Sequence, residues 1–431
     1  MRFFWRRTLR SGLQASAASA QPVENVSVSA NNWGGASQMV AELSKEMETE
    51  LGELNTSELR EQKDATKARL RERSEVFFNS RINRGTHAPW NCSSETSQLA
   101  HVASICAQAV YLLPALPMDS AWSFKSVLSM GANLSGDMKA TELYWAHPKA
   151  GRSVLVVAVR GSASLVDWVV NSNTQEADAS DFVNTSILYG SPARTAPPLC
   201  AHRGFLNSAR TLAVKLATAI NAELMRAPGN VKLLFTGHSA GGAVASTLYA
   251  HFLTHLNKYS WSTLTFELSC ITFGAPPIFT SDINSILQPY LDKILQGPAL
   301  ALITEGDPIP RMDNNHAQVL IGFLLPYDAA SPPITPGGNS TRTSETSKPN
   351  PIVKKLVPSP LHGIGDIIVM ADANSDSNGP LDLRLHQLGK EDLDGYLFAN
   401  FFAHKMFVYK DLVAQVAAGN FNQEDLPMQI E

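Results

Sequence analysis

Short apolar runs of strand length alternate with helical patterns between residues 100 and 326. Four of these runs lie at 154–159, 231–235, 271–273 and 299–304. Strands that alternate with helices build a mainly parallel sheet with helices on its faces, because two parallel strands need a crossover connection. The sequence therefore predicts the α/β class, and 431 residues are enough for one large domain with additions.

The composition argues against several classes of protein. Lysine and arginine number 35 against 39 acidic residues, whereas nucleic-acid-binding domains are usually strongly basic. No apolar run reaches the roughly 18 residues that a transmembrane helix needs. The four cysteines lack the CxxC spacing of zinc or redox sites. Their number is compatible with two disulfides and equally with four reduced thiols. Since no histidine, cysteine and carboxylate cluster appears, we expect neither a metal nor a cofactor.

Three segments differ from the alternating region. Residues 1–23 carry four arginines and no acid. They resemble a mitochondrial transit peptide, with a secretory signal and a disordered terminus as alternatives, so we expect a mitochondrial or cytoplasmic location rather than a secreted one. Residues 36–140 are predicted to form a helical extension or cap. A stretch rich in Pro, Gly, Ser and Thr at about 328–360 is predicted to be a flexible insertion in an α/β domain spanning 141–415.

The pattern Gly-x-Ser-x-Gly occurs once, at Gly237–Gly241 (GHSAG). A strand is predicted before it, and a helix with apolar residues at every fourth position follows. Strand, sharp turn and helix form a nucleophile elbow, in which the glycines leave room for a tight turn. The serine then lies at a helix N-terminus, whose dipole stabilises an anionic intermediate. We therefore predict that Ser239 is a nucleophile in acyl transfer.

Acyl transfer also needs donors for the developing oxyanion. The backbone N–H after the nucleophile, on Ala240, is expected to supply one of them. The second must come from a loop at a neighbouring strand end, and the strand at 154–159 leads directly to Ser162. We predict that Ser162 contributes both its N–H and its hydroxyl.

A short amphipathic segment follows this loop. Leu165, Trp168 and Val169 recur at helical spacing, with polar residues on the opposite side. An amphipathic helix beside an acyl-transfer site is what a lid at a lipid interface requires. An ordinary surface helix is the alternative.

These motifs together resemble the class 3 lipases, the fungal lipase-like family of α/β-hydrolases. The matching pieces are VAVRGSASLVDWVVN, AHRGF at 201–205, LLFTGHSAGGAVAS, ITFGAPPI at 271–278 and EGDPIPRM at 305–312. The resemblance implies an α/β-hydrolase fold, with Ser239 as nucleophile and with Ser162 and the Ala240 amide as oxyanion hole. It also implies a lid at 164–171. His202, in AHRGF, is interpreted as structural support.

The hydrolase resemblance places an acid and then a histidine after the nucleophile. Asp307 follows the apolar run at 299–304 in an Asp-Pro pair, and we predict it as the acid, with Glu305 as the nearest substitute. His404, in AHKMFVY, resembles the terminal histidine of the family and is the predicted base. The other histidines after the acid are His316, His362 and His386, of which His386 is the main rival.

The predicted activity is that of a serine carboxylic ester hydrolase of the triacylglycerol lipase type. His404 would activate Ser239, and Asp307 would orient the imidazole. The expected substrate is an acylglycerol or a related lipid ester, met by transient contact with a lipid interface. Phospholipase A1, lysophospholipase and feruloyl-type esterase activities are alternatives. A catalytically silent hydrolase scaffold used for binding is an alternative from another class.

Replacement of Trp168 by Ser tests the predicted lid. If the apolar face of 164–171 covers the pocket in water and turns toward lipid on opening, the substitution lowers activity on emulsified long-chain esters. Activity on a soluble short-chain ester should hold or rise, because that substrate gains from an open pocket. Equal loss on both substrates, with the fold preserved by circular dichroism, contradicts the lid and leaves Trp168 as a wall of the acyl site.

Overall fold

The computed structural model describes the chain between residues 56 and 422, with gaps. The described residues are 56–82, 85–112, 115–132, 139–161, 176–185, 198–227, 231–259, 266–291, 295–324, 353–372, 374 and 381–422. The predicted targeting segment at 1–23 lies outside these ranges. The same holds for Ser162, for the predicted lid at 164–171 and for most of the predicted insertion.

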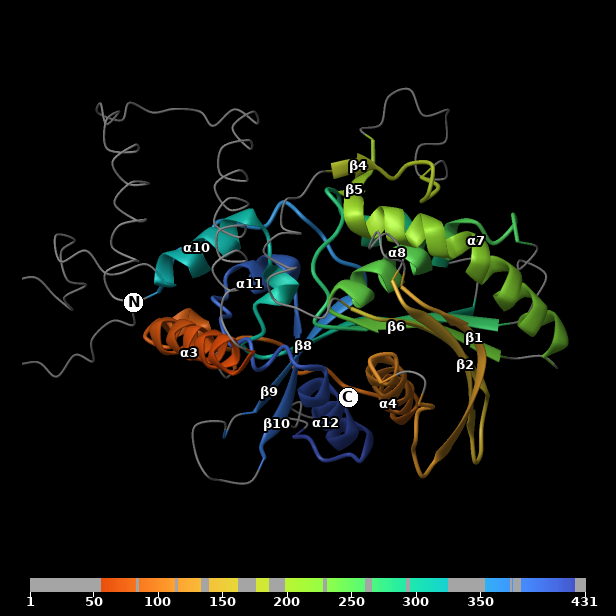
Figure 1. The fold of residues 1–431 in the computed structure, drawn as a ribbon, viewed down its shortest axis with the longest axis horizontal. Coiled ribbons are helices and arrows are strands. Elements are labelled where there is room, and N and C mark those ends of the chain that lie inside the picture. Colours follow the sequence, from red (N-terminus) through yellow and green to blue (C-terminus); the bar gives the residue numbers. More distant parts are fainter. Residues whose placement is uncertain are drawn as a thin grey trace, which may run out of the picture.

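An eight-stranded sheet forms the centre of the protein (Figure 1). Its spatial order is β1-β2-β3-β6-β7-β8-β9-β10, and the five strands from β3 to β9 in this order are parallel neighbours. Antiparallel strands extend this parallel core at both edges. The antiparallel pairs are β1 with β2, β2 with β3, and β10 with β9. The strands are β1 Trp122–Met130, β2 Thr141–Pro148, β3 Val154–Val159, β6 Val231–His238, β7 Phe266–Phe273, β8 Leu295–Thr304, β9 Asp366–Asp372 and β10 Leu383–Leu388. A separate small sheet pairs β4 Glu176–Asp178 with β5 Cys200–His202.

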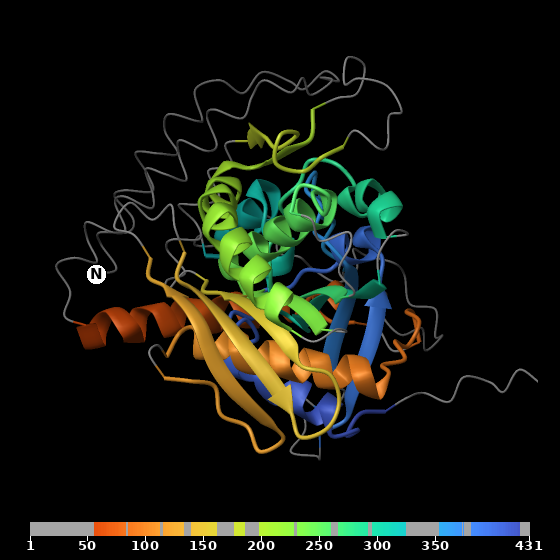
Figure 2. The same ribbon diagram turned by 90° about the vertical axis from the view of Figure 1, so that its right-hand side faces the viewer.

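Helices cover both faces of the large sheet, as Figure 2 shows. Helix α8 packs on β6, β7 and β3, with α7 and α9 outside it. On the other face, α4 packs on β3, β6 and β7 and also against α12. Helix α3 contacts α10. The helices are α3 Thr56–Ser74, η1 Phe78–Ser80, α4 Ser94–Ala109, α7 Arg203–Arg226, α8 Ala240–Thr254, α9 Ile283–Leu291, η3 Ile309–Arg311, α10 Asn314–Leu324, α11 Lys390–Asp394 and α12 Met406–Ala417.

Strand β3 shows why the central strands read as continuous apolar runs. Its side chains point alternately to the two faces, and both faces are covered by helices. Leu155 and Val157 pack in the core under α7 and α8, whereas Val154 and Val156 pack in the core under α4. Every residue of the strand is therefore buried. The predicted α/β-hydrolase class, with a mainly parallel sheet flanked by helices, is confirmed.

The predicted helical extension over 36–140 is wrong in part. Helix α4 covers a sheet face, but residues 122–130 form β1 at the sheet edge. The β1 strand gives no clear apolar alternation, because most of its side chains are partly or fully exposed and its register shifts between Ser126 and Leu128. The described residues contain no helix that is long and apolar enough to cross a bilayer.

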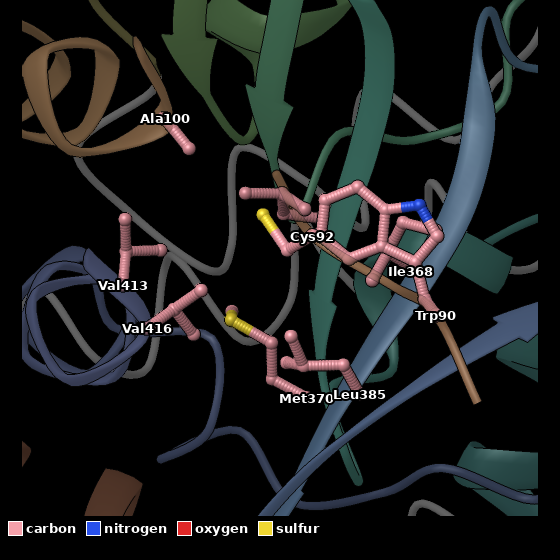
Figure 3. Close-up of a pocket in the computed structure, with 9 residues that line it drawn as sticks. Trp90, Cys92, Ala100, Ile368, Met370, Leu385, Val413 and Val416 are labelled. Carbon is pink, nitrogen blue, oxygen red and sulfur yellow. The ribbon is translucent and has the colours of Figure 1, made fainter. Parts of the chain in front are cut away.

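A small apolar cavity lies between α4, α12 and the strands β8 to β10 (Figure 3). Its volume of about 10 Å³ is close to the minimum that one water needs. Trp90, Cys92, Met370 and Val413 are among the lining residues, and none of the predicted site residues lines it. We therefore regard this cavity as a packing gap in the core. All four cysteines are unpaired, so the four-thiol alternative holds in this structure.

Arg311 joins three segments that are far apart in the sequence. Its side chain is 1% exposed and donates from Nε to the carbonyl oxygen of Asp394 at 2.9 Å and from Nη2 to that of Val357 at 2.9 Å. Asn79 holds the same region, because its amide bonds both the N–H and the carbonyl of Lys354. Residues 353–360 of the predicted flexible insertion are thus fixed to the domain.

Replacement of Arg311 by Met should destabilise the fold by about 3 kcal/mol, because the carbonyl oxygens of Asp394 and Val357 lose this donor and the Asp394 carboxylate loses a buried positive charge 3.9 Å away. The free energy of unfolding in urea measures this loss. Arg226→Met is the matched control, since the side chain of Arg226 is 74% exposed in an i,i+3 pair with Glu223. The control should change stability by less than about 0.5 kcal/mol. Equal effects of the two substitutions contradict the anchoring role of Arg311.

Candidate active site

Ser239 occupies the sharp turn between β6 and α8. Its backbone has φ 58° and ψ −134°, and no other described residue except glycine has a positive φ. Such a conformation costs on the order of 1–3 kcal/mol and is retained where surrounding structure enforces it. The N–H of Ser239 donates to the carbonyl oxygen of Phe273 at 2.9 Å, while its own carbonyl accepts from Ala243 at 3.2 Å. Strand β7 and the first turn of α8 therefore hold the strained residue in place.

The two glycines of the motif are required by close packing. A Cβ on Gly241 would lie 2.2 Å from the carbonyl oxygen of Val159, and a Cβ on Gly237 would lie 2.5 Å from the carbonyl carbon of Gly241. Both obstacles are backbone atoms, which cannot swing aside. Gly241 thus lets the start of α8 lie directly against the end of β3, where the loop to Ser162 begins.

Asp307 follows β8 and is fully buried. A buried carboxylate needs donors, and three reach it. The N–H of Ile309 donates to Oδ1 at 2.8 Å. The Oδ2 atom accepts from the hydroxyl of Tyr409 at 2.5 Å and bonds Nδ1 of His404 at 2.8 Å. Asp307 and His404, which are 97 residues apart in the sequence, are thus direct partners.

Tyr409 on α12 is the site residue that sequence reasoning missed. Its hydroxyl donates to Asp307 and accepts from the N–H of Thr304 at 3.1 Å. Burial, followed by the negative charge of Asp307, holds the pKa of Tyr409 well above its usual value, so the hydroxyl stays a donor. Tyr409 lies five positions after His404, on the same short segment, but a buried tyrosine in an apolar helix gives no sequence signal of this role.

The other candidate acid and histidines lie elsewhere. The Glu305 carboxylate accepts from the N–H of Ile82 at 2.6 Å. His386 is a buried residue of β10, and its backbone pairs with β9 and bridges to Pro89. His316 bonds the carbonyl oxygen of Phe398 at 3.1 Å, and burial lowers its pKa to about 3. His362 pairs through its backbone with Phe279. The bond to Asp307 is instead made by His404.

His404 lies beside the nucleophile elbow. Its ring centroid is 4.5 Å from that of His238, the residue before Ser239. Because Nδ1 faces Asp307, Nε2 on the opposite edge of the ring is the atom available to act as base. His404 directly precedes the cap of α12, so the packing of this helix sets its position.

The predicted oxyanion groups are placed only in part. Ala240 is the first residue of α8, where a backbone N–H has no acceptor within the helix. It is buried and directly follows Ser239. Ser162 and the lid residues Leu165, Trp168 and Val169 lie outside the described residues, so their roles stay predictions. Within the described ranges, no three His, Cys, Asp or Glu side chains are placed to hold a metal ion. His202 stacks on Phe205 at 4.3 Å between ring centroids.

The Rhizomucor miehei lipase in its propeptide complex is similar to this chain with a TM-score of 0.43 and 14% identity, covering 75% of this chain and 84% of that one. A Penicillium expansum triacylglycerol lipase gives a TM-score of 0.40 and 12% identity, covering 72% of this chain and 90% of that one.

Sequence comparisons find related proteins. The secreted mono- and diacylglycerol lipase 1 of Fusarium solani is 27% identical over 162 residues, which are 37% of this chain and 40% of that protein. The match therefore covers less than half of that relative. A family model described as Lipase (class 3) matches residues 156–316, which include Ser239 and Asp307. Over this region the chain is similar to the class 3 lipases, as its motifs led us to expect.

Proposed function

We propose that this protein is a serine carboxylic ester hydrolase of the triacylglycerol lipase type. The observation that carries the proposal is the hydrogen bond of 2.8 Å between the buried carboxylate of Asp307 and Nδ1 of His404, next to the strained elbow of Ser239. A nucleophile, a histidine and an acid that orients the histidine are the parts that acyl transfer through a covalent intermediate requires.

In the proposed reaction, Oγ of Ser239 attacks the ester carbonyl carbon while Nε2 of His404 takes the hydroxyl proton. The imidazolium that forms is stabilised by the negative charge of Asp307. The oxyanion is stabilised by the N–H of Ala240 at the N-terminus of α8 and by Ser162. His404 then protonates the leaving alcohol, and a water that it deprotonates releases the acid from Ser239.

The proposed substrate is an acylglycerol or a related lipid ester. The family match at 156–316 and the name of the Fusarium relative, which is a mono- and diacylglycerol lipase, support this class. A phospholipid, a lysophospholipid and a feruloyl ester use the same chemistry and are distinguished by a substrate panel. A lipid interface that presents the ester is part of the proposal.

Ser239→Ala should abolish ester hydrolysis without loss of the fold. We expect the purified protein to release fatty acid from emulsified acylglycerols faster than from phosphatidylcholine, lysophosphatidylcholine or a feruloyl ester. The alanine variant should be slower by about 10⁴-fold or more, because it lacks the attacking oxygen. A fluorophosphonate probe should label the wild type at Ser239 and leave the variant unlabelled. Unchanged turnover, or full labelling of the variant, would contradict the assignment of the nucleophile.

His404→Ala should be nearly as damaging as Ser239→Ala, and the double variant scarcely worse than either, because triad residues act as a unit. His386→Ala is the control, since His386 lies in β10 and most activity should remain. Rates on a soluble short-chain ester and thermal unfolding of each variant provide the comparison. A reversed pattern, with His386 essential and His404 dispensable, would contradict the assignment of His404 as the base.

A further inference from the structure

A chain of three hydrogen bonds connects the end of β3 to the segment of His404. The N–H of Gly161 donates to the hydroxyl oxygen of Tyr111 at 3.1 Å. This hydroxyl lies 3.1 Å from Nδ1 of His238. On the other edge of the same ring, Nε2 lies 2.6 Å from the backbone carbonyl oxygen of His404. We call Tyr111 and His238 the bridge.

Backbone groups at both ends fix the direction of every bond in the bridge. The N–H of Gly161 can only donate, and the carbonyl of His404 can only accept. Nε2 of His238 must therefore carry its proton, which leaves Nδ1 as an acceptor for the Tyr111 hydroxyl. Burial, and then the nearby charge of His404, holds the pKa of His238 well below its ordinary value. The ring thus stays neutral, in the form that the bridge needs.

The bridge is packed tightly against the nucleophile elbow. A Cβ on Gly161 would lie 2.4 Å from the Tyr111 hydroxyl, 2.5 Å from the carbonyl oxygen of His238 and 3.2 Å from Cβ of Ser239. Only a glycine lets the backbone approach so closely. Burial raises the pKa of Tyr111 to about 12, so its hydroxyl keeps the proton that it donates.

We propose that Tyr111 and His238 are positioning residues, which hold Gly161, just after β3, and the backbone of His404 in fixed positions beside Ser239. The inference rests on the proposed function. Neither side chain takes part in a bond that forms or breaks. Gly161 precedes Ser162, the predicted second oxyanion donor, and the carbonyl of His404 belongs to the predicted base. A displacement of about 1 Å in such groups can cost about 10²-fold in rate.

Tyr111→Phe removes one oxygen atom and breaks two bonds of the bridge. We expect kcat on a soluble short-chain ester to fall about tenfold, because the N–H of Gly161 and Nδ1 of His238 lose their partner. KM should change less than twofold, since the hydroxyl is not proposed to touch substrate. Tyr249→Phe is the matched control. Tyr249 on α8 is fully buried, its hydroxyl has no hydrogen bond among the described residues, and its removal should leave kcat unchanged.

A double variant separates positioning from general stability. His238→Gln keeps a side-chain donor for the His404 carbonyl but removes the ring acceptor. Because both substitutions break the same Tyr111–His238 bond, their effects on kcat should combine to much less than the product of the single effects. Thermal unfolding of all variants is measured alongside, and the loss in kcat should not follow the shift in midpoint.

The outcomes separate this inference from the proposed function. An active, Ser239-dependent enzyme in which Tyr111→Phe keeps the same kcat as Tyr249→Phe overturns the bridge and leaves the function standing. Independent, multiplicative effects of Tyr111→Phe and His238→Gln also overturn it. A wild-type protein inert toward esters and toward the fluorophosphonate probe overturns the proposed function, and with it the role of the bridge.

Discussion

The buried charge of Asp307 is the constraint on which the rest of the site depends. A carboxylate removed from water is very unfavourable unless donors replace the lost hydration. One donor is the local N–H of Ile309, but the other two, Tyr409 and His404, come from the C-terminal segment. Helix α12 must therefore dock on the sheet beside α4 before the charge is satisfied. The acid–histidine pair therefore forms only when Val413 and Val416 of α12 are packed in the core under α4.

The central part of the fold could be predicted from the sequence because its signals are local and strong. Strands β3, β6 and β7 are buried on both faces, which leaves continuous apolar runs. The glycines of the elbow mark a contact between backbones that admits no side chain. Strand β1 could not be predicted in this way, because an edge strand with exposed side chains and a register shift has neither an apolar run nor a clear alternation.

Site residues were predictable to the extent that they stand in ordered motifs. The family resemblance and chain order pointed to Asp307 and His404, and the sequence left His386 as a rival. The geometry favours His404, because His386 is held in β10 while His404 bonds Asp307. Tyr111, Arg311 and Tyr409 were not predicted as partners. Each acts through the polar end of a side chain whose other atoms pack in the interior, and its partner is distant in the sequence, so no spacing reveals it.

The order of the segments between Asp307 and His404 has a consequence for changes in the length of the chain. After Asp307 the chain runs through α10, which ends at Leu324, and is again held to the domain at Lys354 by Asn79. Because those two ends are anchored independently of the site, the stretch between them can change in length at little entropic penalty, about 0.6 kcal/mol for each doubling. An insertion there would leave the bond between Asp307 and His404 in place, so the length of this stretch and the geometry of the pair can vary independently.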